Sequence, residues 1–155
     1  MILIPTITAS NSEVEYMYEL IKEFEGFREN AYVCPAGQWT IGYGSTTYAD
    51  GTPVKKGDKV TREEADELVK HYCENKIKMP KGDWTDGQRE ALCSLIYNIG
   101  QGAFDRSKLK KALENHQWDV AYKNWDWVRA GGKVLPGLVK RRDRERKQFF
   151  LDVNM

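Results

Sequence analysis

Three residues near the start of this sequence have types and a spacing that could carry out hydrolysis. Glu25 is followed after eight residues by Cys34, which is followed after five more by Thr40. A carboxylic acid can donate a proton, while a thiol and a hydroxyl across the substrate can position or activate a water molecule. Each residue also has a plainer explanation, as an exposed glutamate, a small buried thiol and an ordinary strand threonine.

A helix predicted over residues 12–26 would position Glu25. Ser12 and Glu15 have the spacing of a capping box at its start, and Gly26 suits its C-terminal end. Glu25 would then lie in the last turn, beside carbonyl groups that carry partial negative charge. This charge disfavours the ionised carboxylate, so we expect the side chain to hold the proton that a general acid needs.

Cys34 and Thr40 fall in a stretch with a different composition. Residues 31–60 are rich in strand-forming side chains and are punctuated by glycine and proline, which predicts two or three short antiparallel strands. Gly42 and Gly44 indicate a bend or a close approach of the backbone. This stretch is predicted to form a small β lobe.

The rest of the chain, residues 61–155, is predicted to be helical. Capping-box pairs begin two of its helices, Thr61 with Glu64 and Thr85 with Gln88, and the first should bury Ala65, Leu68, Val69, Tyr72 and Ile77. Further helices are predicted over residues 107–114, 118–128 and 137–151. The fold class is therefore α+β, in one domain over residues 1–155.

Composition excludes several classes of function. The net charge is +1 and no glycine-rich phosphate loop is present, so we expect neither nucleic acid nor a nucleotide cofactor as partner. The three cysteines show no metal-ligand spacing and are odd in number, so we expect no metal site and no disulfide framework. The first ten residues are interrupted by Pro5, and we expect no signal peptide and no stable membrane insertion.

The basic segment 133–147 is predicted to be mainly a solvated face of the last helix. Within it, Arg141, Arg142 and Glu145 are expected to form a salt-bridged cluster that ties the C-terminus to the core. Contact of this segment with an anionic wall polymer is the alternative.

The chain resembles the phage-type lysozymes (endolysins, glycoside hydrolase family 24), particularly autolysins of lambdoid phages. Their catalytic pattern is Glu-x8-(Asp or Cys)-x5-Thr, which Glu25, Cys34 and Thr40 match. The resemblance covers roughly residues 12–150 and includes the segments EGFRENAY, TIGYGST, REALCSLIYNIG, FDRSKLKKAL and WVRAGGKVLPGLVKRRDRER.

The resemblance implies a lysozyme-like fold in which a small β lobe packs against a larger helical lobe, with a cleft between them. It implies a muramidase that hydrolyses the β-1,4 bond between N-acetylmuramic acid and N-acetylglucosamine. Glu25 would be the general acid, and Cys34 with Thr40 would position or activate water. Members of this kind are described as inverting, which suits an acid-to-base separation of roughly 6.5–9.5 Å. Weaker local matches assign substrate contacts to Thr46, Tyr97, Ser107 and Asn124, for which helix packing or capping is an equal alternative.

Two positions differ from many relatives. Cys34 stands where many have aspartate, and no adjacent residue clearly provides the lowered pKa that a thiolate would need. Cys34 could orient water with Thr40, attack the sugar covalently, or be assisted by a carboxylate such as Asp50. Ser45 stands where many have histidine, and we expect structural consequences alone.

The resemblance also implies how the protein would reach its substrate. A monomer would be made in the host cytoplasm, and a holin would release it to the peptidoglycan of the periplasm.

Three functions are alternatives to that of an endolysin. They are a non-catalytic peptidoglycan-binding module, a wall peptidase that pairs Cys34 with His71 or His116, and a tail-associated lysozyme.

Overall fold

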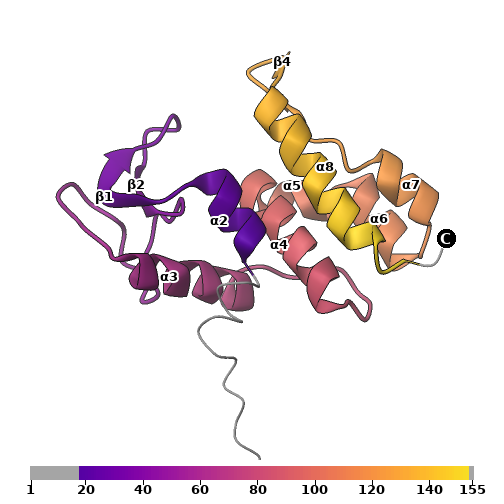
Figure 1. Cartoon of the computed structure of the whole chain (residues 1–155), viewed down its shortest axis with the longest axis horizontal. Helices are drawn as coiled ribbons and strands as arrows, with labels where there is room; N and C mark the ends of the chain where they lie inside the picture. The colour runs from indigo at the N-terminus through magenta and orange to yellow at the C-terminus, as the bar shows by residue number, and fades with distance from the viewer. Residues whose placement is uncertain (1–17, 154–155) are drawn as a thin grey trace, which may run out of the picture. The chain divides into compact units, whose positions relative to one another are not determined.

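A computed structural model describes residues 18–153 of the chain (Figure 1). The chain divides into two compact units, Met1–Tyr72 and Cys73–Met155, which we describe in turn. The predicted capping box of Ser12 and Glu15 lies outside the described residues. None of the described helices has the length and apolarity needed to cross a membrane.

From residue 18 onward, the first unit contains one short helix, a two-stranded sheet and most of a longer helix. The helix α2 covers Glu19–Glu25 and ends at Gly26, which confirms the predicted C-terminal end. The sheet pairs β1 (Arg28–Val33) with β2 (Trp39–Gly42). The strands therefore begin slightly earlier than the predicted lobe of residues 31–60.

The two strands are antiparallel, with Tyr32 opposite Thr40 and Val33 opposite Trp39. Isolated bridges extend this pairing along the chain and join Asn30 to Lys59, Ile41 to Ser45 and Thr47 to Pro53. A two-stranded ribbon is marginal alone, so burial of its apolar side chains must support it. The buried apolar side chains of β2 and of the segment that follows it include Ile41, Tyr43, Val54 and Val60.

The helix α3 (Arg62–Asn75) begins at the predicted capping box. The Thr61 N–H donates to Glu64 Oε1 at 3.0 Å, and the Glu64 N–H donates to Thr61 Oγ1 at 3.1 Å. Ala65 and Val69 are buried as predicted. Tyr72 was assigned to the same face, but it is 39% exposed, so that assignment is wrong.

The second unit is mostly helical, and its helices follow the order of the predictions with three differences. The helix predicted over residues 118–128 ends at Lys123, and a short helix over Gln101–Asp105 and a strand pair over Arg129–Ala130 and Lys133–Val134 were missed. The elements of this unit are α4 (Asp86–Ile99), α5 (Gln101–Asp105), α6 (Lys108–Glu114), α7 (Trp118–Lys123), β3 (Arg129–Ala130), β4 (Lys133–Val134) and α8 (Pro136–Phe150).

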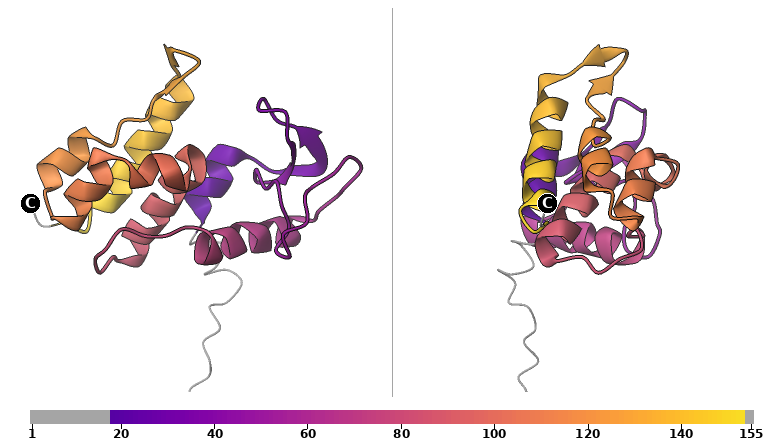
Figure 2. Two further views of the ribbon diagram at one scale, coloured as in Figure 1. Left: turned by 180° about the vertical axis from the view of Figure 1, so that it is seen from behind. Right: turned by 90° about the vertical axis from the view of Figure 1, so that its right-hand side faces the viewer.

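Burial explains why α7 ends early. Trp125 is fully buried, and its indole N–H donates to Glu145 at 3.2 Å, so tertiary contacts take the chain out of the helix. The hairpin that follows turns through Gly131 and Gly132, whose φ angles of 59° and 78° suit a two-residue turn. Figure 2 shows this hairpin at the N-terminal end of α8.

The core of the second unit lies between α4 and α8. The predicted capping box of Thr85 and Gln88 is present at the start of α4, and Leu92 and Leu95 are completely buried. Aromatic rings complete this core, with centroids 5.3 Å apart for Trp125 and Phe149.

The predicted charged cluster of α8 is confirmed within this core. Glu145 is fully buried and lies 2.8 Å from the Nε of Arg142 and 3.4 Å from the Nε of Arg141. The hydroxyl of Ser94 on α4 donates to Glu145 at 2.5 Å. Because each of these buried charges has a partner, the cluster can join α8 to α4 without an isolated charge in the core.

Candidate active site

Glu25 is the last residue of α2, and contacts around it fix the position of this helix end. Gly26 follows with φ of +72°, and its N–H donates to the Lys22 carbonyl at 3.1 Å. The ring of Phe27 lies 5.5 Å from that of Tyr43, in the turn after β2. The end of α2 is therefore attached to the end of the β ribbon.

Charged contacts join α2 and the Phe27 segment to α3 as well. Lys22 Nζ lies 3.0 Å from Asp66 Oδ1, and both side chains are largely buried. The guanidinium of Arg62 lies 4.5 Å from the Phe27 ring centroid. Glu25 is half-buried on this attached segment, so its backbone position is well supported.

Cys34 begins the loop that joins β1 to β2. Its N–H donates to the Gln38 carbonyl at 2.9 Å, and its carbonyl accepts from the Gly37 N–H at 2.8 Å. Gly37 has a φ of +85°, which favours glycine at this position of the turn. The Cys-Pro-Ala-Gly sequence thus forms a tight turn that leaves the thiol partly exposed.

Thr40 lies across the ribbon from Tyr32 and is 3% exposed. Its hydroxyl donates to the Gln38 carbonyl at 3.0 Å and also lies within hydrogen-bonding reach of the Cys34 thiol. The structure therefore brings together Cys34 and Thr40, which the sequence separates by five residues.

The turn lowers the pKa of the Cys34 thiol from its ordinary value. The largest cause is the backbone N–H of Gln38, followed by the Thr40 hydroxyl, with a smaller contribution from the Ala36 N–H. These donors stabilise the thiolate. The expectation that nothing adjacent lowers this pKa is therefore wrong. The missed donors are main-chain groups, whose direction a residue sequence does not reveal.

The single proton of the Thr40 hydroxyl cannot be donated to two acceptors at once. In the structure it is donated to the Gln38 carbonyl, which leaves the hydroxyl oxygen able to accept from a neutral Cys34 thiol. On ionisation of Cys34, rotation of the hydroxyl would present the same proton to the sulfur. Thr40 is thus placed to interact with either protonation state of Cys34.

The glycine-rich segment after Thr40 packs tightly against α3. A Cβ atom added to Gly42 would lie 2.9 Å from the Cβ of Ala65, and φ at Gly42 is +63°. Ser45 exchanges two backbone hydrogen bonds with Ile41, at 2.8 and 2.9 Å. Thr46 follows and is half-buried, with its carbonyl accepting from the Val54 N–H at 2.9 Å.

The other three predicted substrate contacts lie in the second unit. Tyr97 is half-buried near the end of α4. Ser107 caps α6, because its hydroxyl accepts from the Lys110 N–H at 3.0 Å. Asn124 caps α7, because its side chain donates to the Val120 carbonyl at 2.8 Å. Capping accounts for the last two, and their contact with substrate stays a prediction.

Neither histidine is among the groups that act on the Cys34 thiol within the described residues, which are Gln38, Thr40 and Ala36. His116, in the second unit, stacks on Trp118 with ring centroids 5.1 Å apart. A cysteine–histidine hydrolase needs a hydrogen-bonded pair, so the site is not arranged for that chemistry. Between residues 18 and 153 no three His, Cys, Asp or Glu side chains are grouped as metal ligands.

Comparison with known proteins gives consistent matches over most of the chain. Residues 22–145 match a family model described as phage lysozyme. The chain is 37% identical over 142 residues to the endolysin of Acyrthosiphon pisum secondary endosymbiont phage 1, covering 84% of this chain and 92% of that protein. It is 35% identical to the endolysin of Salmonella phage P22, with the same coverages. Some other relatives carry the name SAR-endolysin.

A solved structure is similar as well. The endolysin from Escherichia coli O157:H7 phage FAHEc1 superimposes with a TM-score of 0.73 at 32% identity, over 90% of this chain and 93% of that chain. The similarity therefore extends from local motifs to the order and packing of the elements.

Proposed function

The chain belongs to the phage lysozyme family, and from this premise we propose how its candidate site hydrolyses peptidoglycan. The protein is an endolysin with an α+β, lysozyme-like fold, and its activity is that of a muramidase. The bond cleaved is the β-1,4 linkage between N-acetylmuramic acid and N-acetylglucosamine. The observation that supports the site is the pairing of Cys34 with Thr40 in the same unit as Glu25.

Glu25 acts as the general acid. It donates its proton to the glycosidic oxygen as the bond to the anomeric carbon breaks, so the departing sugar leaves as a neutral alcohol. The attachments of Phe27 to Tyr43 and Arg62 support its position. The family resemblance further assigns substrate contacts to Thr46, Tyr97, Ser107 and Asn124, which would bind the glycan.

Cys34 acts on the attacking water. As a thiolate it accepts a proton from the water while the water oxygen bonds to the anomeric carbon. Thr40 holds the water in position beside the sulfur. Support comes from the donors of Gln38 and Ala36, which lower the pKa of the thiol. After the reaction Glu25 is ionised and Cys34 is neutral, and exchange with solvent restores both groups.

The test is hydrolysis of purified Gram-negative peptidoglycan, with new reducing ends as the readout. We expect Glu25→Gln to abolish hydrolysis and Cys34→Asp to retain it, while Cys34→Ala is weak. Glu29→Gln, which removes a nearby exposed carboxylate, is the matched control and should remain active. Full activity of a folded Glu25→Gln variant would contradict the assignment of the acid.

The configuration of the first product tests the role of Cys34. Attack by water gives the inverted α-anomer, whereas a covalent glycosyl–cysteine intermediate gives the β-anomer. NMR of the product within seconds of mixing distinguishes them. If the first product is the β-anomer, Cys34 acts as a nucleophile and does not activate water.

We further propose that the protein acts as a monomer and reaches the periplasm after release by a holin. Host cells that express the chain with and without a holin should differ in the onset of lysis. Because some relatives are named SAR-endolysins, release without a holin is the contrasting result, and equal lysis in both cultures would support it.

A further inference from the structure

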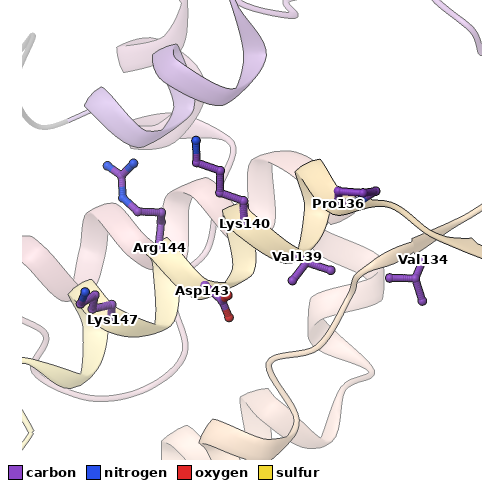
Figure 3. Close-up of a pocket in the computed structure, with 7 residues that line it drawn as sticks. All are labelled: Val134, Pro136, Val139, Lys140, Asp143, Arg144 and Lys147. Carbon is purple, nitrogen blue, oxygen red and sulfur yellow. The ribbon is translucent and has the colours of Figure 1, made fainter.

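A groove of about 550 Å³ runs along one face of α8 in the second unit (Figure 3). Its apolar lining comes from Val134, Pro136 and Val139, and its cationic lining comes from Lys140, Arg144 and Lys147. The proposed hydrolysis uses none of these residues.

Helical periodicity explains how the groove forms. Lining positions on α8 recur at intervals of three and four residues, from Pro136 to Lys147, and so lie along one side of the helix. β4 adds Val134 at one end. The groove thus has an apolar end beside the hairpin and a cationic stretch along the helix, as Figure 3 shows.

The exposed groups of the groove favour an occupant with both small apolar groups and negative charges. Val134 is 47% exposed, and Lys140 and Lys147 are exposed as well. A simple polyanion would form ion pairs with the cationic side chains and leave the apolar end of the groove exposed to solvent. A purely apolar ligand would have to desolvate the cations without compensation.

One carboxylate in the lining, that of Asp143, further restricts which ligands could bind in the groove. Asp143 is paired with Arg146, whose guanidinium also donates to the Trp125 carbonyl at 2.8 Å. The side chain of Asp143 is 60% exposed and would repel a flat anionic bilayer, but it could accept from an ammonium group. A concave surface of this size also fits a short peptide better than it fits the flat surface of a bilayer.

We propose that this groove binds the acidic peptides attached to the glycan strands of peptidoglycan. Such a peptide offers carboxylates for Lys140 and Lys147, alanine methyl groups for Val134 and Val139, and the ammonium of its diamino acid for Asp143. The identity of this ligand rests on the proposed function. Binding would raise the residence of the protein on peptide-bearing glycan.

The test is a titration of the isotopically labelled full chain with the isolated tetrapeptide Ala–D-Glu–diaminopimelate–D-Ala, followed by NMR. We expect saturable shifts at Val134, Val139 and the neighbouring α8 amides. The K140Q/K147Q variant should bind about 2- to 30-fold more weakly, the range for two exposed charge contacts. Its matched control is K56Q/K59Q, which removes two exposed lysines from the first unit and should bind normally.

Three results would overturn the inference. They are the absence of saturable shifts in the groove, equal binding by K140Q/K147Q and wild type, and sedimentation with phosphatidylglycerol vesicles that depends on Lys140 and Lys147 while the peptide does not bind. Hydrolysis of glycan from which the peptides have been removed is measured separately. Failure of wild type to hydrolyse intact peptidoglycan would contradict the proposed function alone, because the titration requires no catalysis.

Discussion

Replacement of Thr40 by valine is the most informative perturbation of the candidate site. Valine has nearly the same shape and suits a strand, so the substitution removes little beyond the hydroxyl. Two interactions are lost: the hydrogen bond to the Gln38 carbonyl, at 3.0 Å, and the contact with the Cys34 thiol.

The structure predicts a small effect on stability. The Gln38 carbonyl still accepts from the Cys34 N–H at 2.9 Å, so Thr40→Val leaves no buried acceptor unsatisfied at that carbonyl. Loss of one hydrogen bond then costs about 1 kcal/mol of unfolding free energy. For catalysis we expect a loss of about 10²- to 10⁴-fold, which corresponds to roughly 2.7–5.4 kcal/mol in the barrier.

Two assays separate these effects. Release of reducing ends reports the barrier, and the pH dependence of alkylation by iodoacetamide reports the pKa of Cys34. Cys73 and Cys93 are each 6% exposed and should react slowly, so the fast phase belongs to Cys34. In Thr40→Val the midpoint of the alkylation rate against pH should move to higher pH. In Thr40→Ser this midpoint should stay at the wild-type value.

A folded Thr40→Val variant that hydrolyses peptidoglycan within about threefold of the wild-type rate would refute the catalytic role of Thr40, because an assisting group is expected to contribute far more. An unchanged alkylation midpoint would refute the link between the hydroxyl and the thiol. A rate loss with an unchanged midpoint would assign Thr40 to the water alone.

Three further predictions concern stability. Glu145→Gln leaves two buried guanidinium groups without their counter-charge and should lower the unfolding free energy in urea by about 3–5 kcal/mol, whereas Asp143→Asn, at an exposed pair, should change it by less than about 1 kcal/mol. Gly42→Ala should cost more than Gly51→Ala in thermal unfolding, because both have positive φ but only the first places its Cβ within 2.9 Å of another side chain; equal losses would contradict the steric explanation. Burial and the Asp58 carboxylate raise the pKa of Tyr48 to about 12, so stability from the neutral phenol should be lost as pH rises from about 10 to 12. Ultraviolet titration should show this late phenolate, and a decline at alkaline pH that persists in Tyr48→Phe would have another cause.

Local sequence patterns predicted the features that depend on neighbouring residues. The capping boxes at Thr61 and Thr85 are present, because capping involves groups only three residues apart. The end of α2 at Gly26 is likewise local, since glycine readily adopts the positive φ found there. The cluster of Arg141, Arg142 and Glu145 was expected because charges of opposite sign recur at helical spacing.

The features that were missed depend on contacts between distant parts of the chain. Helix α7 ends at Lys123 because Trp125 is buried against α8, and helical propensity carries no information about that contact. Tyr72 has the right periodicity for burial and is nevertheless exposed, because periodicity identifies a face and not its neighbour.

The sequence by itself determined which groups are available for catalysis, namely a carboxyl at a helix end and a thiol and a hydroxyl in a β ribbon. The tertiary structure decided their chemical state. The Cys34–Gln38 turn directs main-chain N–H groups and the Thr40 hydroxyl at the sulfur, and these donors lower the pKa of the thiol. A pKa depends on the direction and distance of surrounding dipoles, which exist only once the chain has folded.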